Sequence, residues 1–190
     1  MTVILGPDGL ARCAWVGEDP DYRRYHDEEW GVPLHGDRAL FEKLSLEGFQ
    51  AGLSWITILR KRPHFREVFA GFEPAAVAAF GDVEIEMLMA DAGIIRNRAK
   101  IEATISNARL VVDMDEGELD AVMWSFAPAA RRRPATFADI PAVTEESAAM
   151  SKALRKRGFR FVGATTMYAL MQSAGMVDDH VEACWRAGLL

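Results

Sequence analysis

The sequence has no long apolar run, no excess of basic residues and only two cysteines. Each of these shortages excludes or disfavours a class of protein. No uninterrupted apolar stretch approaches the roughly 18 residues that a membrane-spanning helix needs, so we expect no membrane span. The opening residues, MTVILGPDGLAR, lack the basic region and apolar segment of a signal peptide. The two cysteines say little about the cellular compartment, and we expect a cytoplasmic protein.

The formal net charge of −6 gives no general reason to invoke nucleic acid, so any DNA-binding surface must be a local patch. Half of the 190 residues are hydrophobic and 26% are charged, as in an ordinary globular protein. That length fits one domain with a real core, and we expect residues 1–190 to form a single domain. Residues 1–11 are expected to be a loose lead-in.

No β-type alternation of useful length is present, and helical patterns recur along the chain, which predicts an all-α protein. The expected helical segments are 21–29, 41–62, a stretch capped by Pro63 that runs to Phe69, 83–92, 96–113, 119–126, 144–157, 161–174 and 178–186. Gly93 is expected to end one helix by a left-handed cap, and Gly158 to end another. The proline-rich segment that holds Arg131–Arg133 is expected to be a loop.

The predicted helix from Phe41 to Arg62 is apolar nearly all round, which is typical of a buried helix. Between Lys43 and Arg60 its only ionisable side chain is Glu47. A buried carboxylate is costly unless something pairs with it. Glu47 therefore either makes an ion pair inside the core, or faces a pocket and accepts hydrogen bonds from a ligand.

Two glycines interrupt the same segment, and each costs about 1 kcal/mol relative to alanine inside a helix. Gly48 and Gly52 could allow a ligand to approach the backbone, mark a tight helix crossing, or split the segment into two helices. Trp55 is either core filler or a stacking platform. Tyr25 and Trp30 belong to an N-terminal group of aromatic residues that forms either a small packed cluster or a pocket wall.

Four residues near the two ends of the chain form a candidate metal site. Cys13 and His26, with His180 and Cys184, would give a Cys2His2 set of the kind that tetrahedral zinc accepts. Four protein ligands leave no open position, so such a site would be structural. Unrelated buried thiols and ordinary histidines, or a Cys13–Cys184 disulfide, are the alternatives.

The segment from Asp91 to Ile101, DAGIIRNRAKI, predicts two helices joined by a short turn that contains Gly93. Such a turn can offer backbone N–H groups and a helix N-terminus to a phosphate, with Arg96 and Lys100 as reinforcement. An ordinary helix corner with a solvated basic face would show the same pattern.

Six blocks of sequence occur in order between Arg12 and Cys184: RCAWV, YHDEEWGVP, LEGFQAGLSWITIL, DAGIIRNRAKI, SKALRKRGFRFVG and DDHVEAC. Together they resemble the 3-methyladenine DNA glycosylase I family, an all-α branch of the helix-hairpin-helix DNA glycosylase superfamily. The resemblance implies two helical lobes with a zinc clip that joins the N- and C-terminal segments. It also implies a monofunctional enzyme that removes 3-methyladenine from alkylated double-stranded DNA without cleaving the strand, and we expect a monomer.

The resemblance also assigns roles to particular residues. It implies that Glu47 is the catalytic group and hydrogen-bonds the extruded base, that Tyr25 contributes a hydroxyl, and that Trp55 stacks on the base. We expect Trp30 to line the same pocket. Structural zinc is implied at the four cysteine and histidine positions. The expected DNA contacts are Gly52, Leu53, Gly93, Arg96 and Lys100, with Leu53 pressed into the base stack.

One block departs from the family pattern, because Phe49 stands where relatives carry a glutamine. A position that faces the core would absorb this change. The Arg131–Arg133 loop also has no counterpart in the family pattern. Two other functions fit parts of the chain: a non-catalytic DNA or protein adaptor that lacks a base pocket, and a metal-dependent hydrolase that uses the histidine and cysteine cluster.

Overall fold

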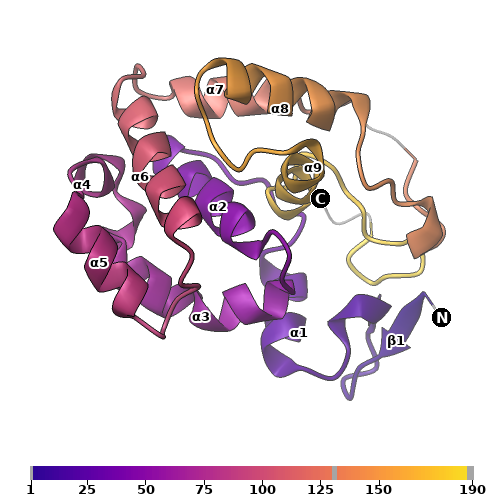
Figure 1. Ribbon diagram of the computed structural model, residues 1–190. Helices are drawn as coiled ribbons and strands as arrows, with labels where there is room; N and C mark the ends of the chain where they lie inside the picture. Colours follow the sequence, from indigo (N-terminus) through magenta and orange to yellow (C-terminus); the bar gives the residue numbers. More distant parts are fainter. Residues whose placement is uncertain (1, 130–131, 188–190) are drawn as a thin grey trace.

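The computed structural model describes residues 2–129 and 132–187, and α-helices make up most of this part of the chain (Figure 1). The prediction of a mostly helical protein is confirmed. The helices are α1 (Pro20–Glu28), α2 (Asp37–Gln50), α3 (Trp55–Val68), α4 (Pro74–Ala78), α5 (Asp82–Ala90), α6 (Arg98–Val112), α7 (Glu118–Trp124), α8 (Glu145–Lys156) and α9 (Ala164–Ser173). Short 3-10 turns cover Ala14–Val16, Ala70–Phe72 and Phe137–Asp139. Within the described ranges, no helix is both long and apolar enough to cross a membrane.

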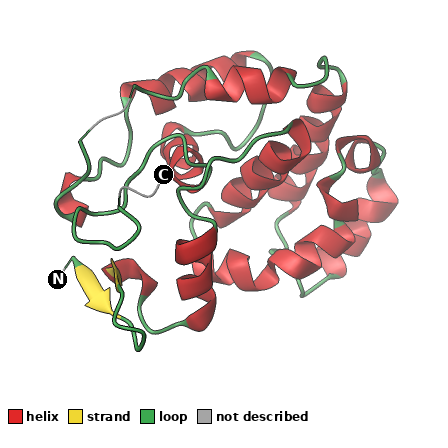
Figure 2. Cartoon of the chain, turned by 180° about the vertical axis from the view of Figure 1, so that it is seen from behind, coloured by secondary structure: helices red, strands yellow, loops and turns green. Residues whose placement is uncertain are grey.

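The expected loose lead-in is wrong for the described part of residues 1–11. Strand β1 (Val3–Leu5) pairs antiparallel with β2 (Ala11–Cys13), and Val3 lies opposite Cys13. Gly9 makes the tight turn between the strands with a φ of +77°. Figure 2 shows this small sheet beside the N-terminus, at one end of the molecule. Three-residue strands are too short to show an alternating pattern, which is why the sequence did not indicate them.

Helix α2 lies at the centre of the fold and packs against α3, α6, α7 and α9 (Figure 1). Every residue from 43 to 49 is buried, as the nearly all-apolar pattern predicted. Phe49 is fully buried, and its ring centroid lies 4.7 Å from that of Phe65 and 5.8 Å from that of Phe69. Position 49 therefore faces an aromatic core, where phenylalanine fits.

The predicted single helix from Phe41 to Arg62 is in fact two helices. Helix α2 ends at Gln50 and α3 begins at Trp55, with Gly52 at a φ of +84° in the turn between them. That conformation favours glycine. Gly52 therefore splits the segment into two helices, which was one of the three interpretations of the glycines offered by the sequence. Gly48 lies inside α2, where an added Cβ would be 3.4 Å from the Cβ of Phe161, an ordinary van der Waals contact, so no tight helix crossing explains this glycine.

Pro63 does not cap a separate helix, as the sequence suggested, but lies inside α3. A proline in a helix interior removes one backbone hydrogen bond and usually bends or ends the helix. In α3 the buried side chains of Ile58 and Phe65 lie on either side of it in the sequence, so core packing continues past the proline. Tertiary packing outweighs the local preference at this position.

The segment from Asp91 to Ile101, predicted as two helices joined by a turn, connects α5 to α6. Helix α5 ends at Ala90 and α6 begins at Arg98. Gly93 is not a left-handed cap, because its N–H donates to the Asp91 carboxylate at 2.7 Å and its φ is not positive. A side chain at Gly93 would collide with His64 of α3. The glycine therefore leaves room for the end of the His64 ring beside the turn.

The last expected helix, from Asp178 to Arg186, is not formed, and turns and irregular backbone occupy residues 178–187. The Asp178 carboxylate accepts from the backbone N–H of His180 at 3.1 Å, a local bond that competes with helix formation. Downstream, the backbone N–H of Glu182 donates to the Pro134 carbonyl. The N–H of Trp185 donates to the carbonyl of Ala11 in β2, so this segment is tied to the N-terminal sheet.

Two helix boundaries agree with the sequence analysis. Thr144 is the N-cap of α8, and its hydroxyl accepts from the N–H of Ser147 at 3.2 Å. Gly158 follows α8 with a φ of +98°, the left-handed conformation of a helix-ending glycine.

Lys100, in the first turn of α6, has a structural role that sequence reasoning missed. Its side chain is buried, and its ammonium donates to the carbonyls of Phe49 at 2.8 Å and Ala51 at 2.7 Å. These carbonyls belong to the C-terminal end of α2, where a positive charge is favourable. Lys100 therefore holds the turn between α2 and α3 against α6.

Replacing Lys100 with methionine should destabilise the fold by about 1–3 kcal/mol, because two buried carbonyls lose a charged donor. Urea unfolding of the variant and of the wild type measures the difference. Lys152→Met, at an exposed position of α8, is the matched control and should leave the free energy of unfolding unchanged. Equal stability of Lys100→Met and the wild type would show that the two bonds contribute nothing net.

Candidate active site and candidate metal centre

A cavity of about 340 Å³ opens where α1, α2, α3 and α9 meet. Aromatic side chains form much of its wall, and Glu47 and Ser173 supply polar groups. The lining residues are Trp15, Tyr22, Tyr25, Trp30, Glu47, Gln50, Ser54, Trp55, Ile140, Ala169, Gln172 and Ser173. The structure thus brings together the four residues that the sequence assigned to substrate binding: Tyr25, Trp30, Glu47 and Trp55.

Glu47 is buried in α2 and borders this cavity, and in the described ranges no arginine is paired with it. Its carboxylate accepts from the hydroxyl of Ser173, at the end of α9, at 2.9 Å. Burial raises the pKa of Glu47 to about 7, while the nearby Lys43 ammonium and the Ser173 hydrogen bond act in the opposite direction. The result is a carboxyl group that titrates near neutral pH in a desolvated pocket.

Tyr25 and Trp55 stand beside each other on the wall, with ring centroids 5.4 Å apart and planes tilted by 43°. Burial, together with the charge of Glu47, raises the pKa of the Tyr25 hydroxyl well above its usual range. The indole N–H of Trp55 is buried and has no acceptor among the described protein groups. A buried donor without a partner costs free energy, so this N–H is available to a ligand.

Two contacts that the sequence analysis did not foresee position the wall. The hydroxyl of Tyr22 accepts from the backbone N–H of Ile56 at 2.9 Å, in the first turn of α3. This bond satisfies one free donor at the helix start and fixes the neighbouring Trp55. Ser173, the partner of Glu47, carried no signal in the sequence, since a serine near the end of an apolar helix is common.

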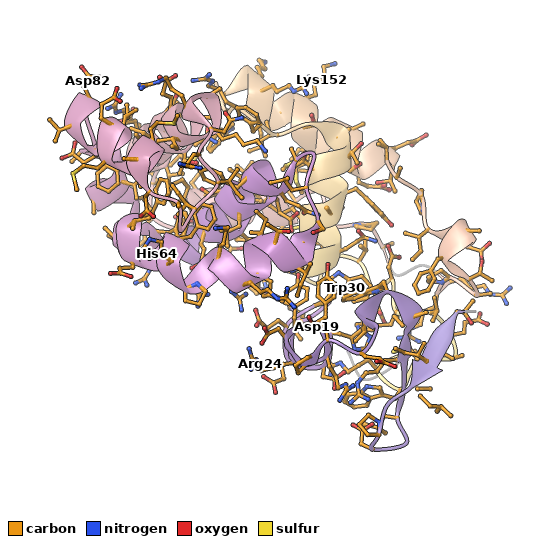
Figure 3. The ribbon with its side chains drawn as sticks, turned by 60° about the horizontal axis from the view of Figure 1, so that its bottom comes forward. Asp19, Arg24, Trp30, His64, Asp82 and Lys152 are labelled. Atoms are coloured by element: carbon orange, nitrogen blue, oxygen red, sulfur yellow. The ribbon has the colours of Figure 1, made fainter. Side chains whose placement is uncertain are left out.

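Trp30 links the cavity to the cysteine and histidine cluster. Its ring centroid lies 4.6 Å from that of His180 and 6.2 Å from that of His26. Figure 3 shows Trp30 well away from Asp82, which lies at the other end of the molecule. The same indole therefore contacts the candidate metal ligands and borders the cavity.

The ends of the chain meet at a buried group of potential metal ligands. The donor atoms of Cys13, His26 and Cys184 all lie within 4.8 Å of one another, and both cysteines are free thiols. The Sγ of Cys184 is 3.4 Å from the Nε2 of His26. Hydrogen bonds from the Cys13 thiol and from His26 lower the pKa of Cys184, so a thiolate is favoured there.

His180, the fourth predicted ligand, borders this group without belonging to it. Its ring centroid is 5.0 Å from that of His26, and its Nε2 atom is buried with no hydrogen-bond partner in the described ranges. Its Nδ1 contacts Asp178 at 2.9 Å, and the Nδ1 of His26 contacts Asp27 at 2.8 Å. Carboxylates in these positions orient a histidine so that Nε2 can bind a metal. Cys13, His26 and Cys184 thus form a possible metal site, with His180 at its border.

The predicted DNA-contacting residues lie on the turn after α2, on the segment between α5 and α6, and in the first turn of α6. Leu53 is 44% exposed beside Gly52, and Arg96 is exposed. Lys100 corrects one expectation, because its ammonium is bonded to the carbonyls at the end of α2 and is not free to reach a phosphate. Lys61 of α3 donates to the carbonyls of Ala92 and Gly93, so the turn that holds Gly93 is braced from α3.

The arginine-rich loop packs against the C-terminal segment. Arg133 pairs with Asp178 at 2.7 Å, and Arg132 pairs with Glu182 at 3.3 Å. Arg131, the first residue of the predicted cluster, lies outside the described residues. Arg133 thereby supports the aspartate that contacts His180.

Glu47→Gln should make the stability of the protein less dependent on pH. Because burial raises the pKa of Glu47 from 4.5 to about 7, its stabilising contribution is present below the ordinary pKa and is lost as the pH rises through 7. As the pH rises from acidic to mildly alkaline, the free energy of unfolding of the variant should therefore increase relative to that of the wild type by up to about 3 kcal/mol. Urea unfolding at several pH values measures this, and a difference that stays constant with pH would contradict it.

Comparisons with known proteins agree with this geometry. A sequence profile of the methyladenine glycosylase family matches residues 15–187. The chain is 49% identical to DNA-3-methyladenine glycosylase 1 of Escherichia coli K12 over 179 residues, which cover 92% of this chain and 96% of that protein.

Two solved structures also resemble the chain. A crystal structure of 3-methyladenine DNA glycosylase I has a TM-score of 0.88 and 48% identity, covering 92% of this chain and 98% of the other. A single-residue variant of such an enzyme, in complex with 3-methyladenine, has a TM-score of 0.85 and 34% identity, with coverages of 92% and 96%. The chain belongs to the methyladenine glycosylase family and is a hydrolase that acts on N-glycosyl bonds.

Proposed function

We propose that this enzyme removes 3-methyladenine from alkylated double-stranded DNA by hydrolysing the bond between the base and the sugar. The observation that carries the proposal is the carboxyl of Glu47, buried at the wall of an aromatic cavity beside the unpartnered indole N–H of Trp55. The relatives named above support this substrate, since one of them is described in complex with 3-methyladenine.

A base inside a duplex is out of reach of such a cavity, so the target nucleotide must be flipped out of the stack. Flipping costs a few kcal/mol and is cheapest where pairing is already weakened, as it is for a methylated base. Leu53, exposed on the turn directly before α3, is suited to fill the space that the base leaves. Arg96, exposed before α6, is suited to contact a phosphate near that turn.

The charge of the substrate explains why a carboxylate suits this pocket. A 3-methyladenine nucleoside carries a positive charge, whereas undamaged adenine is neutral. Two opposite unit charges about 4 Å apart attract each other by roughly 4 kcal/mol at an effective dielectric constant of 20. Stacking on Trp55 adds about 1–3 kcal/mol but acts on every base. Glu47 therefore discriminates by charge, and the aromatic wall supplies affinity without discrimination.

The reaction needs little acid assistance. The bond between C1′ and N9 breaks with its electron pair moving to the base, which leaves as neutral 3-methyladenine. A water oxygen forms the new bond to C1′ and loses its proton to solvent. Glu47 favours the positive charge as it moves towards the sugar. No lysine lines the cavity in the described ranges, so no amine is placed to attack the sugar, and the DNA strand stays intact.

Glu47→Gln should slow the release of 3-methyladenine about a hundredfold, because the amide keeps the shape and loses the charge. The assay incubates methylated double-stranded DNA with enzyme and identifies the released bases by chromatography, which also reports any 3-methylguanine. Glu145→Gln, an exposed glutamate in the first turn of α8, is the matched control. If Glu47→Gln released 3-methyladenine at the wild-type rate, Glu47 would not belong to the active site. If the wild-type protein released no base, a non-catalytic adaptor role would be favoured.

We also propose that Cys13, His26, His180 and Cys184 hold a structural zinc ion. A zinc ion bound by four protein ligands supplies a cross-link and leaves no open position for chemistry. In this chain the cross-link would join the N-terminal sheet to the C-terminal segment. The buried Nε2 of His180, which has no partner among the described protein atoms, supports the assignment.

Cys184→Ser should reduce the zinc content from about one ion per chain to near zero and lower the thermal midpoint, because a three-ligand site binds zinc weakly. Plasma emission spectroscopy of the purified protein measures the metal. The wild type should keep its base-release activity after mild chelation that leaves the fold intact. The assignment would be refuted if the purified wild-type protein contained no zinc, or if the zinc content of Cys184→Ser equalled that of the wild type.

A further inference from the structure

Lys43 lies one helical turn before Glu47 in α2 and is 7% exposed. Its ammonium is 5.4 Å from the ring centroid of Tyr25 and 5.2 Å from that of Trp55. It does not line the base cavity but borders a second cavity of about 210 Å³, and the two cavities share Ser173. The ammonium therefore packs against the Tyr25 and Trp55 rings of the base cavity while Lys43 itself lines the second cavity.

The charged and polar groups around Lys43 come from every helix packed against it. They are Glu42 and Glu47 of α2, Tyr25 and Glu28 of α1 and Glu29 just after it, Arg62 and Arg66 of α3, and Ser173 of α9. In the described ranges no carboxylate forms a direct ion pair with Lys43. The ammonium therefore acts on its neighbours through space.

Two of the four surrounding carboxylates are already paired with arginines, and a third, Glu28, is exposed to solvent. Glu29 forms a two-pronged pair with Arg62, at 2.5 Å and 2.7 Å. Glu42 pairs with Arg66 at 2.7 Å. Among the residues that the structure describes, the neutral hydroxyl of Ser173 is the one hydrogen-bond partner of Glu47. It is thus the carboxylate whose charge Lys43 has to balance.

A buried carboxyl in an aromatic pocket tends to take up a proton, since desolvation penalises its charged form. Protonated Glu47 would lose the charge on which recognition of a cationic base depends. The positive charge of Lys43 opposes that protonation and lowers the pKa of Glu47, while burial raises it. The same positive charge repels a cationic base, so it lowers the affinity of the ionised pocket.

We propose that Lys43 is a positioning residue that keeps Glu47 ionised in the empty base cavity and thereby sets the acidic limit of base release. This inference rests on the proposed function for its effect on catalysis. Its effect on the ionisation of Glu47 does not depend on that function and can be measured by itself.

Lys43→Met is the decisive variant, because methionine keeps an unbranched chain and removes the charge. Rates of 3-methyladenine release are measured from about pH 5.5 to about pH 9, a range that brackets the titration of Glu47. The half-maximal point of the acidic limb should move up by about one pH unit. On that limb the rate falls about tenfold relative to the wild type, and the alkaline plateau is kept or raised.

Controls separate a charge effect from structural damage. Lys152→Met, on the surface of α8, should leave the profile in place. In the Glu47→Gln background, Lys43→Met should cause no shift, because the group that it tunes is gone. A rate that falls equally at every pH, with the half-maximal point unmoved, would overturn the inference.

A second measurement does not require activity. The difference in free energy of unfolding between the protein and its Glu47→Gln variant, followed against pH, reports the pKa of Glu47. Lys43→Met should move the midpoint of that difference up by about one unit, and an unmoved midpoint overturns the inference. An inactive wild type with a shifted midpoint would instead refute the proposed function and leave the role of Lys43 standing.

Discussion

The site depends on one unusual constraint, a carboxyl group placed inside an otherwise apolar helix. Glu47 is buried in α2, and the hydroxyl of Ser173 is its direct hydrogen-bond partner, 126 residues away in the chain. That bond fixes where α9 ends relative to α2, and it leaves the rest of the carboxylate facing the cavity. An arginine in place of the serine would have stabilised the negative charge of Glu47 but would also have neutralised it in an ion pair. A neutral partner leaves the carboxyl without a direct ion pair in the part of the chain that the structure describes.

Sequence reasoning predicted most of the helices because their signals are local. The apolar pattern of α2, the N-cap Thr144 and the left-handed Gly158 all act within a few residues. It also identified Glu47, because a lone acid in a buried helix is conspicuous. The two-helix split at Gly52 was only one of several alternatives, since a glycine can serve a turn or a close contact.

The features that sequence reasoning missed depend on contacts between distant segments. Ser173 and Tyr22 became meaningful only when the fold placed them beside Glu47 and Ile56. Lys100 was misinterpreted, because a lysine in a basic segment suggests a phosphate contact, whereas its ammonium caps the carbonyls at the end of α2. The cysteine and histidine cluster was predicted by residue type, but the expected helix around His180 did not form, since Asp178 binds the backbone and ring of His180.

The cysteine and histidine cluster has a consequence for how a new chain acquires its activity. Cys13 and His26 leave the ribosome early, whereas His180 and Cys184 are among the later residues to be made. Until those later residues arrive, Trp30 lacks the His180 ring that packs against it, so one wall of the base cavity has no support. A nascent or prematurely terminated chain should therefore hold no finished pocket.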